Sequence, residues 1–310
     1  MKNKIVVVGS SNIDLIMKMD RLPEKGETVI DGKFMQVYGG KGANQAVAAA
    51  RAGGNVAFVS CVGEDAATPQ MIHNYQKDGI DTRFVFHEKE VASGHALIMI
   101  DRQGENIISV APEANALLLP EKIDQAAPVF DDAALMLLQF EIPEETIKYA
   151  IDLANRKNIP VMWNVAPAKP FDFSYISKTS ILVLNEVEAG FLAGIPVSNA
   201  ADAEHAASIL VKRGVEKVIV TLGSKGVLAA VRTETVFVSA FQVEAVDTTA
   251  AGDTFCGAFA VGVTEGKPLK EALRFASAAS AISVTRMGAQ PSVPTRPEID
   301  NFLHQNIVFE

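Results

Sequence analysis

The sequence predicts an α/β fold with a central, mainly parallel sheet, helices on both faces of that sheet, and a small antiparallel β lid. Two observations carry this prediction. Short, almost continuous runs of Val, Ile and Leu recur along the chain, as in strands buried on both faces, and stretches with helical spacing lie between them. Strand and helix alternating in this order form right-handed βαβ units. The 310 residues, 48% of them hydrophobic, suffice for a large core, and we expect one domain over residues 1–310.

The individual elements follow from these runs in chain order. Strands are predicted at 4–9, 55–63, 134–141, 159–165, 181–185 and 217–223. Helices are predicted at 42–53, 143–158 and 202–214, and the last two end on Asn and Gly, which commonly stop a helix. Near the C-terminus, 252–266 and 268–288 are predicted to be two helices rich in Ala, Gly and Ser, whose small side chains permit close packing.

Two segments interrupt this order. From about 10 to 40 and from about 91 to 110, apolar and polar residues alternate, with Gly, Asp and Pro at the expected turns. We assign the lid to about 14–38 and 91–110. Because one apolar face of such a projecting sheet needs cover, the pattern also predicts a homodimer formed through the lid.

Charge, cysteines and the N-terminal residues disfavour several classes of protein. A formal net charge of −9 argues against a nucleic-acid binder. Cys61 and Cys256 lie outside any C-x-x-C pair or His cluster, so we expect buried free thiols in a reducing compartment; a disulfide or a metal site is the alternative. The apolar run after "MKNK" is too short for a signal peptide or membrane span. These features predict a cytoplasmic protein that does not bind membranes.

Polar residues follow several of the predicted strands, and ligands of open parallel sheets bind outside the carboxyl ends of the strands. Each has an ordinary structural alternative: a turn for Asn12 and Asp14, a helix cap for Glu141, and a helix start for "NEVE" at 185–188. Together on one sheet edge they predict a polar ligand site. The polar positions are Ser10, Ser11, Asn12, Asp14, Glu141, Asn185, Glu188 and the "LGSKG" stretch at 222–226.

The stretch "YGGKGANQAVAAA" (38–50) places a tight glycine turn before a helix. It presents the backbone amides of Gly39, Gly40 and Gly42, with Lys41 and Asn44 at the helix mouth. It matches neither the Walker A spacing nor G-x-G-x-x-G, whose third glycine position holds a glutamine here. The pattern therefore gives little support to a nicotinamide-dependent oxidoreductase.

A second stretch, "DTTAAGDTF" (247–255), predicts an anion-binding helix start. If the helix begins near Gly252, the amides of Ala250, Ala251 and Gly252 are free to bind a phosphoryl group in transfer. Asp253 stands at the same helix end, where we expect it to stay ionised and to act as a base through its placement, not through a raised pKa. The alternative is that Asp253 only stabilises the helix start.

The two stretches together resemble the two signature regions of the ribokinase (PfkB) family of carbohydrate kinases. "GSSNID", "LLQFE", "NEVE", "TLGSKG" and "TRMGAQPSVP" follow in the family's order over essentially the whole chain. The resemblance implies a ribokinase-like fold and an ATP-dependent kinase that phosphorylates the 5-hydroxyl of D-ribose by in-line transfer. The alternatives are a family kinase for 2-deoxyribose, another sugar or a nucleoside, and a non-catalytic sugar sensor on the same scaffold.

The resemblance also implies a role for each matching residue. Asp253 takes the proton of the sugar hydroxyl, and the amides of Ala250, Ala251 and Gly252 form the anion hole. Glu188 orients Mg²⁺ through water. The sugar hydroxyls are expected at Asn12, Asp14, Gly40, Lys41, Asn44, Glu141 and Asp253. ATP is expected at Asn185, Thr221, Gly223, Ser224, Gly226, Gly252 and Ser277. Potassium is expected at Asp247, at Thr249 and at backbone oxygens near Ser283, Arg286, Gly288 and Ser292.

Two residues depart from the family pattern. Ser277 stands where a bulkier polar residue often contacts adenine, and His95 stands in the lid where a small apolar residue is expected. His95 is either satisfied within the lid or reshapes the sugar pocket. Trp163 is expected in core packing on a strand; a stacking platform for a ligand is the alternative.

Overall fold

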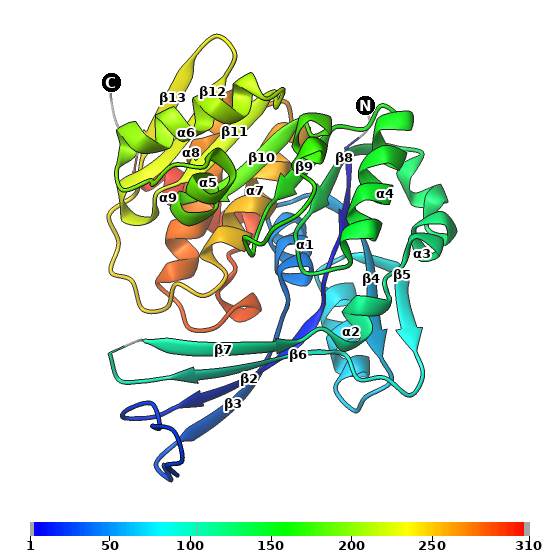
Figure 1. Ribbon diagram of the computed structural model, residues 1–310, viewed down its shortest axis with the longest axis vertical. Coiled ribbons are helices and arrows are strands. Elements are labelled where there is room, and N and C mark those ends of the chain that lie inside the picture. Colours follow the sequence, from blue (N-terminus) through cyan, green and yellow to red (C-terminus); the bar gives the residue numbers. More distant parts are fainter. Residues whose placement is uncertain (1–2, 104, 307–310) are drawn as a thin grey trace.

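The computed structural model describes residues 3–103 and 105–306, and its main element is a nine-stranded sheet (Figure 1). The strand order is β13-β12-β11-β10-β9-β8-β1-β4-β5; neighbours from β5 to β11 pair in parallel, whereas β12 pairs antiparallel with both β11 and β13. All six predicted strands are confirmed. The strands are β1 (Lys4–Val8), β4 (Asn55–Gly63), β5 (Asp81–Glu88), β8 (Ala133–Leu138), β9 (Val161–Asn164), β10 (Ile181–Asn185), β11 (Lys217–Thr221), β12 (Gly226–Val231) and β13 (Thr235–Ser239).

Helices cover both faces of this sheet, as predicted, and each face has its own apolar core. One core lies beneath α1, α2, α7, α8 and α9, and the other beneath α3, α4, α5 and α6. The helices are α1 (Lys41–Arg51), α2 (Thr68–Lys77), α3 (Pro120–Gln125), α4 (Glu144–Arg156), α5 (Glu186–Ala193), α6 (Ala200–Lys212), α7 (Ala251–Thr264), α8 (Leu269–Val284) and α9 (Arg296–Gln305). Short 3₁₀ turns occur at 113–117, 127–130, 173–178, 223–225 and 290–292.

Helices α1 and α7 pack unusually closely against each other. A β-carbon built at Gly257 on α7 would lie 2.5 Å from the Ala48 β-carbon and 2.6 Å from the Gln45 carbonyl oxygen. A side chain at this position would therefore push the two helices apart. The small residues predicted to permit close packing thus bring the first turns of α1 and α7 together.

A second, four-stranded sheet projects from the body of the molecule (Figure 1). Its order is β3-β2-β6-β7; β2 pairs antiparallel with β3 and parallel with β6, and β6 pairs antiparallel with β7. The apolar side chains Phe34, Leu97, Ile107, Ile108 and Val110 of this sheet are about half exposed. The strands are β2 (Asn12–Lys18), β3 (Lys33–Gly39), β6 (Gly94–Ile100) and β7 (Asn106–Ala111).

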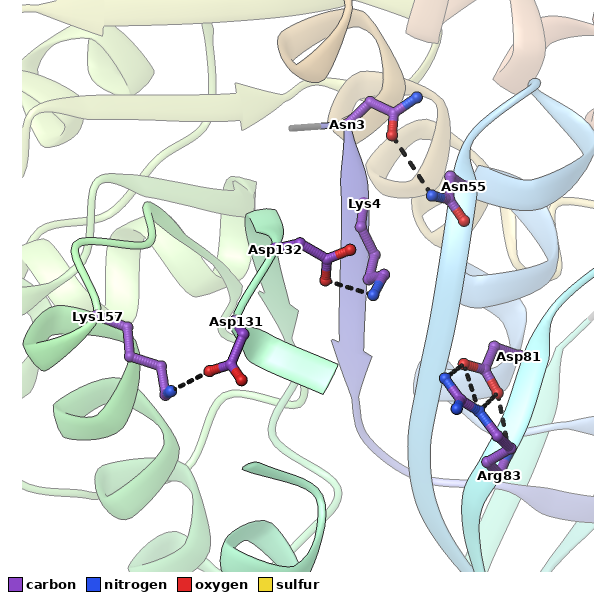
Figure 2. Close-up of polar contacts among 8 residues, drawn as sticks. All are labelled: Asn3, Lys4, Asn55, Asp81, Arg83, Asp131, Asp132 and Lys157. Carbon is purple, nitrogen blue, oxygen red and sulfur yellow. Dashed lines mark hydrogen bonds and ion pairs between the residues drawn. The ribbon is translucent and has the colours of Figure 1, made fainter. Parts of the chain in front are cut away.

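The amino ends of the main-sheet strands carry surface ion pairs (Figure 2). Lys4 pairs with Asp132, Lys157 pairs with Asp131, and Arg83 pairs with Asp81. Exposed pairs of this kind contribute little to stability, because water screens them. The charged residues at this edge are thus paired with one another on the surface.

Three further predictions concern the core and the membrane. Cys61 and Cys256 are buried and unpaired, as predicted. Trp163 lies in the core against Phe140 and Phe171, so it is not exposed for stacking. Within residues 3–103 and 105–306, no helix is long and apolar enough to cross a membrane.

Candidate active site

Asn12 and Asp14 lie on strand β2, so neither is a turn former. The Asn12 Oδ1 accepts a hydrogen bond from Asn115 Nδ2 at 2.7 Å, and Asn115 Oδ1 accepts one from the Ser11 amide at 2.8 Å. A β-carbon at Gly94 would lie 2.3 Å from the same Asn12 oxygen. The Asn12 side chain is therefore held in one orientation by its surroundings.

The Asp14 carboxylate is buried with one oxygen unsatisfied. Among the described residues, Asp14 Oδ1 has no hydrogen-bond partner. The other oxygen fills the space beside Gly39, where a β-carbon would lie 2.0 Å away. Burial, reinforced by the charges of Glu141 and Asp253, raises the pKa of Asp14 to about 7. Because buried polar atoms normally have partners, this oxygen is a candidate contact for a bound ligand or water.

Glu141 is tied to the start of α1. Its Oε2 accepts hydrogen bonds from Ser10 Oγ at 2.6 Å and from the Lys41 amide at 3.0 Å. It does not cap α4, whose N-cap residue is Pro143. The residue before α1, Gly40, has a φ of 88°, which a residue with a side chain rarely adopts. The carboxylate thus lies at the glycine turn that the sequence singled out.

Asp253 lies in the first turn of α7, buried between two amides of α1. Its Oδ2 accepts from Asn44 Nδ2 at 3.0 Å and its Oδ1 from Gln45 Nε2 at 2.9 Å. Burial raises the pKa of Asp253, although the Lys41 charge and the two amides oppose the shift. The sequence-based expectation of an unraised pKa is therefore wrong, since it considered the helix end and not the burial.

Lys41 is the positive charge among these acids. Burial alone would lower the pKa of Lys41, but the charges of Asp253, Glu141 and Glu188 together outweigh burial and raise it. The ammonium group therefore stays charged, and it reduces the repulsion among three neighbouring carboxylates.

Helix α7 begins at Ala251, one residue earlier than predicted. Ala250 has a φ of 58°, and the Ala251 amide donates to the Thr248 carbonyl oxygen at 3.2 Å. The prediction of three free amides is therefore wrong for Ala251, because the tight turn before the helix uses it. The amides of Gly252 and Asp253 have no acceptor within the helix. No atom lies within 4 Å of a β-carbon position at Gly252, so this turn faces open space.

Two cavities meet at this turn. One, of about 250 Å³, is lined by Lys41, Asn185, Glu188, Asp253 and the 250–252 turn among others. The other, of about 290 Å³, is mainly apolar. Both are lined by Thr221, Thr248, Ala251 and Gly252. Of the seven residues predicted for the nucleotide, Asn185 lines the first cavity, and the second is lined by Thr221, Gly223, Ser224, Gly226, Gly252 and Ser277.

Asn185 and Glu188 also form the capping box of α5. Asn185 Oδ1 accepts from the Glu188 amide and Glu188 Oε2 accepts from the Asn185 amide, both at 2.8 Å. The "NEVE" stretch therefore does start a helix, which was the structural alternative to a ligand site. Both residues nevertheless line the smaller cavity. Burial raises the pKa of Glu188.

Asp247 closes a loop against the end of α8. Its Oδ1 accepts from the amide and hydroxyl of Thr249 at 2.9 and 2.6 Å, and its Oδ2 accepts from the Gly288 amide at 2.9 Å. Burial would raise the pKa of Asp247, but these hydrogen bonds outweigh it and lower the pKa. The structure thus joins three of the six residues predicted for potassium. The Arg286 amide donates to the Ser283 carbonyl oxygen, the Arg286 side chain pairs with Glu298, and Ser292 lies buried in the 290–292 turn.

His95 faces away from the Asp14 side of the lid. Asp14 is in register with Ala96, and because side chains alternate along a strand, the neighbouring His95 points to the opposite face. Its Nδ1 lies 2.7 Å from the Ser93 carbonyl oxygen. This favours a histidine satisfied within the lid over one that reshapes the pocket.

Sequence reasoning missed several buried amides around the site. Gln45 donates a hydrogen bond to Asp253, and Gln290 donates one to Asn44. The Gln45 amide is in turn hydrogen-bonded to Gln139 and Asn164. The available signal was that Gln139 and Asn164 both stand at carboxyl ends of predicted strands, the rule already applied to Glu141.

The arrangement places a buried carboxylate at a helix start, beside the polar side chains of Lys41 and Asn44 and next to two adjoining cavities, which suits a phosphotransferase. A family model described as "pfkB family carbohydrate kinase" matches residues 2–296. The chain therefore belongs to the pfkB family of carbohydrate kinases, and it is an ATP-dependent sugar kinase.

Individual members of the family are similar over nearly their whole length. A ribokinase of Haemophilus influenzae is 39% identical over 98% of this chain and 99% of its own. A deoxyribokinase of Salmonella typhi is 38% identical over 97% and 99%. The structure of an Arabidopsis thaliana ribokinase complexed with ribose and ATP matches with a TM-score of 0.91 and 34% identity, covering 98% of this chain and 99% of the other.

Proposed function

We propose that this enzyme transfers the γ-phosphoryl group of ATP to the 5-hydroxyl of D-ribose, forming ribose 5-phosphate. The observation that carries the proposal is the position of Asp253, which is hydrogen-bonded to Asn44, lies near the charges of Asp14, Lys41 and Glu141, and lines the cavity at the start of α7. The similarity to ribokinases, one of them solved with ribose and ATP, supports this choice of substrates.

In the proposed reaction Asp253 is the general base. Its carboxylate takes the hydroxyl proton while the hydroxyl oxygen forms a bond to the γ-phosphorus and the bond from that phosphorus to the bridging oxygen of ADP breaks. The raised pKa makes the Asp253 carboxylate a stronger base than an exposed aspartate. The free amides at the start of α7 stabilise the charge on the transferred group. Of the predicted anion hole, the amides of Ala250 and Gly252 remain available to bind the transferred group, whereas the Ala251 amide donates to the Thr248 carbonyl oxygen.

The sugar is proposed to lie beneath the lid, within one domain that spans the chain. The unsatisfied Asp14 oxygen and the ammonium of Lys41 suit a substrate dense in hydroxyl groups, since leaving them unpaired would be costly. The proposed sugar contacts are Asn12, Asp14, Gly40, Lys41, Asn44 and Glu141.

The nucleotide is proposed to occupy the two joined cavities. The mainly apolar cavity suits a purine ring, and the shared turn at Thr248–Gly252 leads from it to Asp253. Ser277 lines the apolar cavity, so its small side chain leaves room that a bulkier residue would fill. We assign the nucleotide to Asn185, Thr221, Gly223, Ser224, Gly226, Gly252 and Ser277.

Two cations are proposed as cofactors. Glu188 offers a carboxylate in the smaller cavity, the hard oxygen ligand that Mg²⁺ prefers, and Mg²⁺ when bound offsets phosphate charge. For K⁺, the fitting observation is the carboxylate of Asp247, which closes its loop on Thr249 and on the Gly288 amide. Within residues 3–103 and 105–306, no group of three or more His, Cys, Asp or Glu could hold a metal ion, so both sites depend on carbonyls, water or substrate.

The remaining proposals concern assembly and location. The half-exposed apolar side chains of the lid sheet support a homodimer formed through the lid. Two buried free thiols support a reducing, cytoplasmic location.

A coupled assay of ADP formation tests the substrate. We expect D-ribose to be turned over with a higher kcat/KM than 2-deoxyribose, fructose or adenosine. Preference for 2-deoxyribose would reassign the sugar, an alternative favoured by the similarity to a deoxyribokinase, and would leave the mechanism intact. Tight sugar binding without ATP consumption would favour a sensor instead.

A further inference from the structure

Gln45 is completely buried, and its side-chain amide makes three hydrogen bonds. Nε2 donates to Asp253 Oδ1 at 2.9 Å and to Asn164 Oδ1 at 3.0 Å, while Oε1 accepts from Gln139 Nε2 at 2.8 Å. Because no part of Gln45 reaches the surface, a substrate in the pocket does not touch it. Its action on the reaction must therefore pass through Asp253.

The direction of the Gln45 amide is set by the main chain of β10. Asn164 Nδ2 donates to the Val183 carbonyl oxygen at 3.0 Å, and a carbonyl can only accept. Asn164 must therefore turn its Oδ1 toward Gln45, and because this oxygen accepts, Gln45 must donate to it from its NH₂ group. The two hydrogens of the Gln45 NH₂ group are therefore both used in hydrogen bonds, one to Asn164 and the other to Asp253.

The two oxygens of Asp253 are thus held by adjacent residues of α1. Asn44 holds Oδ2 and Gln45 holds Oδ1, so the carboxylate cannot rotate about its Cβ–Cγ bond without losing a hydrogen bond. Asn44 is a proposed sugar contact, whereas Gln45 is not. An amide suits this role because it neither takes nor gives a proton at neutral pH.

We infer that Gln45 is a positioning residue, which keeps the Asp253 carboxylate aligned with the sugar hydroxyl through an amide relay anchored on β10. The inference rests on the proposed function, since it takes Asp253 as the base. Without the Gln45 donor, Oδ1 is free to turn toward the Lys41 ammonium. The charged or titratable groups that face Asp253 are Lys41, Glu141, Asp14, Glu188 and Cys256.

The test is Gln45→Met, which keeps the volume and removes the donor. We expect kcat to fall on the order of 10- to 100-fold, as for a misaligned reacting group. We expect the KM for the sugar to stay within about twofold, because alignment and not sugar contact is lost. The acidic limb of the kcat–pH profile should move to higher pH, because a donor that favours the ionised carboxylate is gone.

Two further variants keep the test decisive. Gln45→Asn retains a buried amide that is one methylene too short, so it is expected to fold and to shift the acidic limb in the same direction. Thr146→Val is the matched control, since it removes a buried 2.6 Å hydrogen bond to the Leu118 carbonyl on the other face of the sheet. It should leave the pH profile unchanged.

Asp253→Asn, measured in parallel, separates the two proposals. If Asp253→Asn is inactive while both Gln45 variants retain kcat and the pH profile, the positioning role is wrong and the proposed function stands. A pH-independent loss of kcat in the Gln45 variants would also overturn it, because that result indicates general structural damage. Near-normal turnover of Asp253→Asn would instead reject the base, and with it this inference.

Discussion

Asp253 Oδ2 accepts a 3.0 Å hydrogen bond from Asn44 Nδ2, although 209 positions separate these residues in the chain. The contact joins the glycine turn and helix at 38–50 to the helix start at 247–255, the two stretches that carry the family resemblance. It is possible because α1 and α7 approach closely at Gly257, where any side chain would collide with Ala48. Several expectations for variants follow from this geometry.

Replacing the proposed base should abolish turnover without abolishing binding. In Asp253→Asn we expect kcat to fall about 100- to 10,000-fold, the usual contribution of a general base. Calorimetric titration should still detect ribose and ATP, because the sugar contacts and the cavities remain. Turnover close to that of the parent enzyme would show that another group removes the proton.

Adding one methyl group at Gly39 should weaken sugar binding. In Gly39→Ala the new β-carbon would lie 2.0 Å from Asp14 Oδ2, so the carboxylate must move. We expect the KM for the sugar to rise roughly tenfold, equivalent to about 1.4 kcal/mol, with the KM for ATP unchanged. Gly32→Ala is the matched control, since its nearest neighbour is the flexible end of Met17. An unchanged sugar KM in Gly39→Ala would place the sugar elsewhere.

The buried Asp14 should make the ligand-free enzyme less stable as the pH rises. Its pKa in the folded protein, about 7, exceeds the ordinary pKa of an aspartate, 3.8, so between these pH values the folded state binds more protons than the unfolded state. The Asp14 contribution therefore declines from about pH 4 to pH 7, by up to about 1.4 kcal/mol per pH unit. Asp14→Asn lacks this decline, so urea unfolding should show a larger stability gain at pH 7 than at pH 5. A gain independent of pH would contradict the assignment.

Potassium should activate the enzyme through the Asp247 loop. At equal ionic strength, we expect turnover in choline chloride to be several-fold lower than in potassium chloride, since the ion would hold the loop that precedes α7. Asp247→Asn should weaken the response, because it removes the carboxylate that closes the loop on Thr249 and Gly288. Equal turnover of the parent enzyme in both salts would rule out the potassium site.

A charge on the lid should dissociate the proposed dimer. Leu97 on β6 is 54% exposed, so Leu97→Asp costs the monomer little but places a charge in a lid interface. Sedimentation velocity at micromolar concentration should report a dimer for the parent and a monomer for this variant. Val187→Asp, at an exposed position on α5, is the control and should remain dimeric. A monomeric parent enzyme would overturn the proposal.

Much of the fold could be predicted because burial leaves a direct pattern in the chain. Strands buried on both faces are nearly continuous apolar runs, and all six such runs are strands. Strands β5, β12 and β13 were not predicted. Strands β5 and β13 lie at the edges of the sheet, where polar and apolar residues mix and the periodic signal is weak. Strand β12 is buried, but three of its six residues are Gly or Ala, which are poor strand formers. The start of α7 was misplaced by one residue, since a backbone turn at Ala250 leaves no composition signal.

By itself, the sequence determined the class of fold, the lid segments, and the two stretches whose residue types suit phosphoryl transfer. Only the tertiary structure decided which side chains meet. It showed that Glu141 binds the start of α1, that burial raises the pKa of Asp253, and that Gln45 lies behind that carboxylate. The reason is physical: local sequence sets backbone preference and periodicity, whereas burial, charge coupling and hydrogen-bond direction depend on neighbours brought from distant parts of the chain.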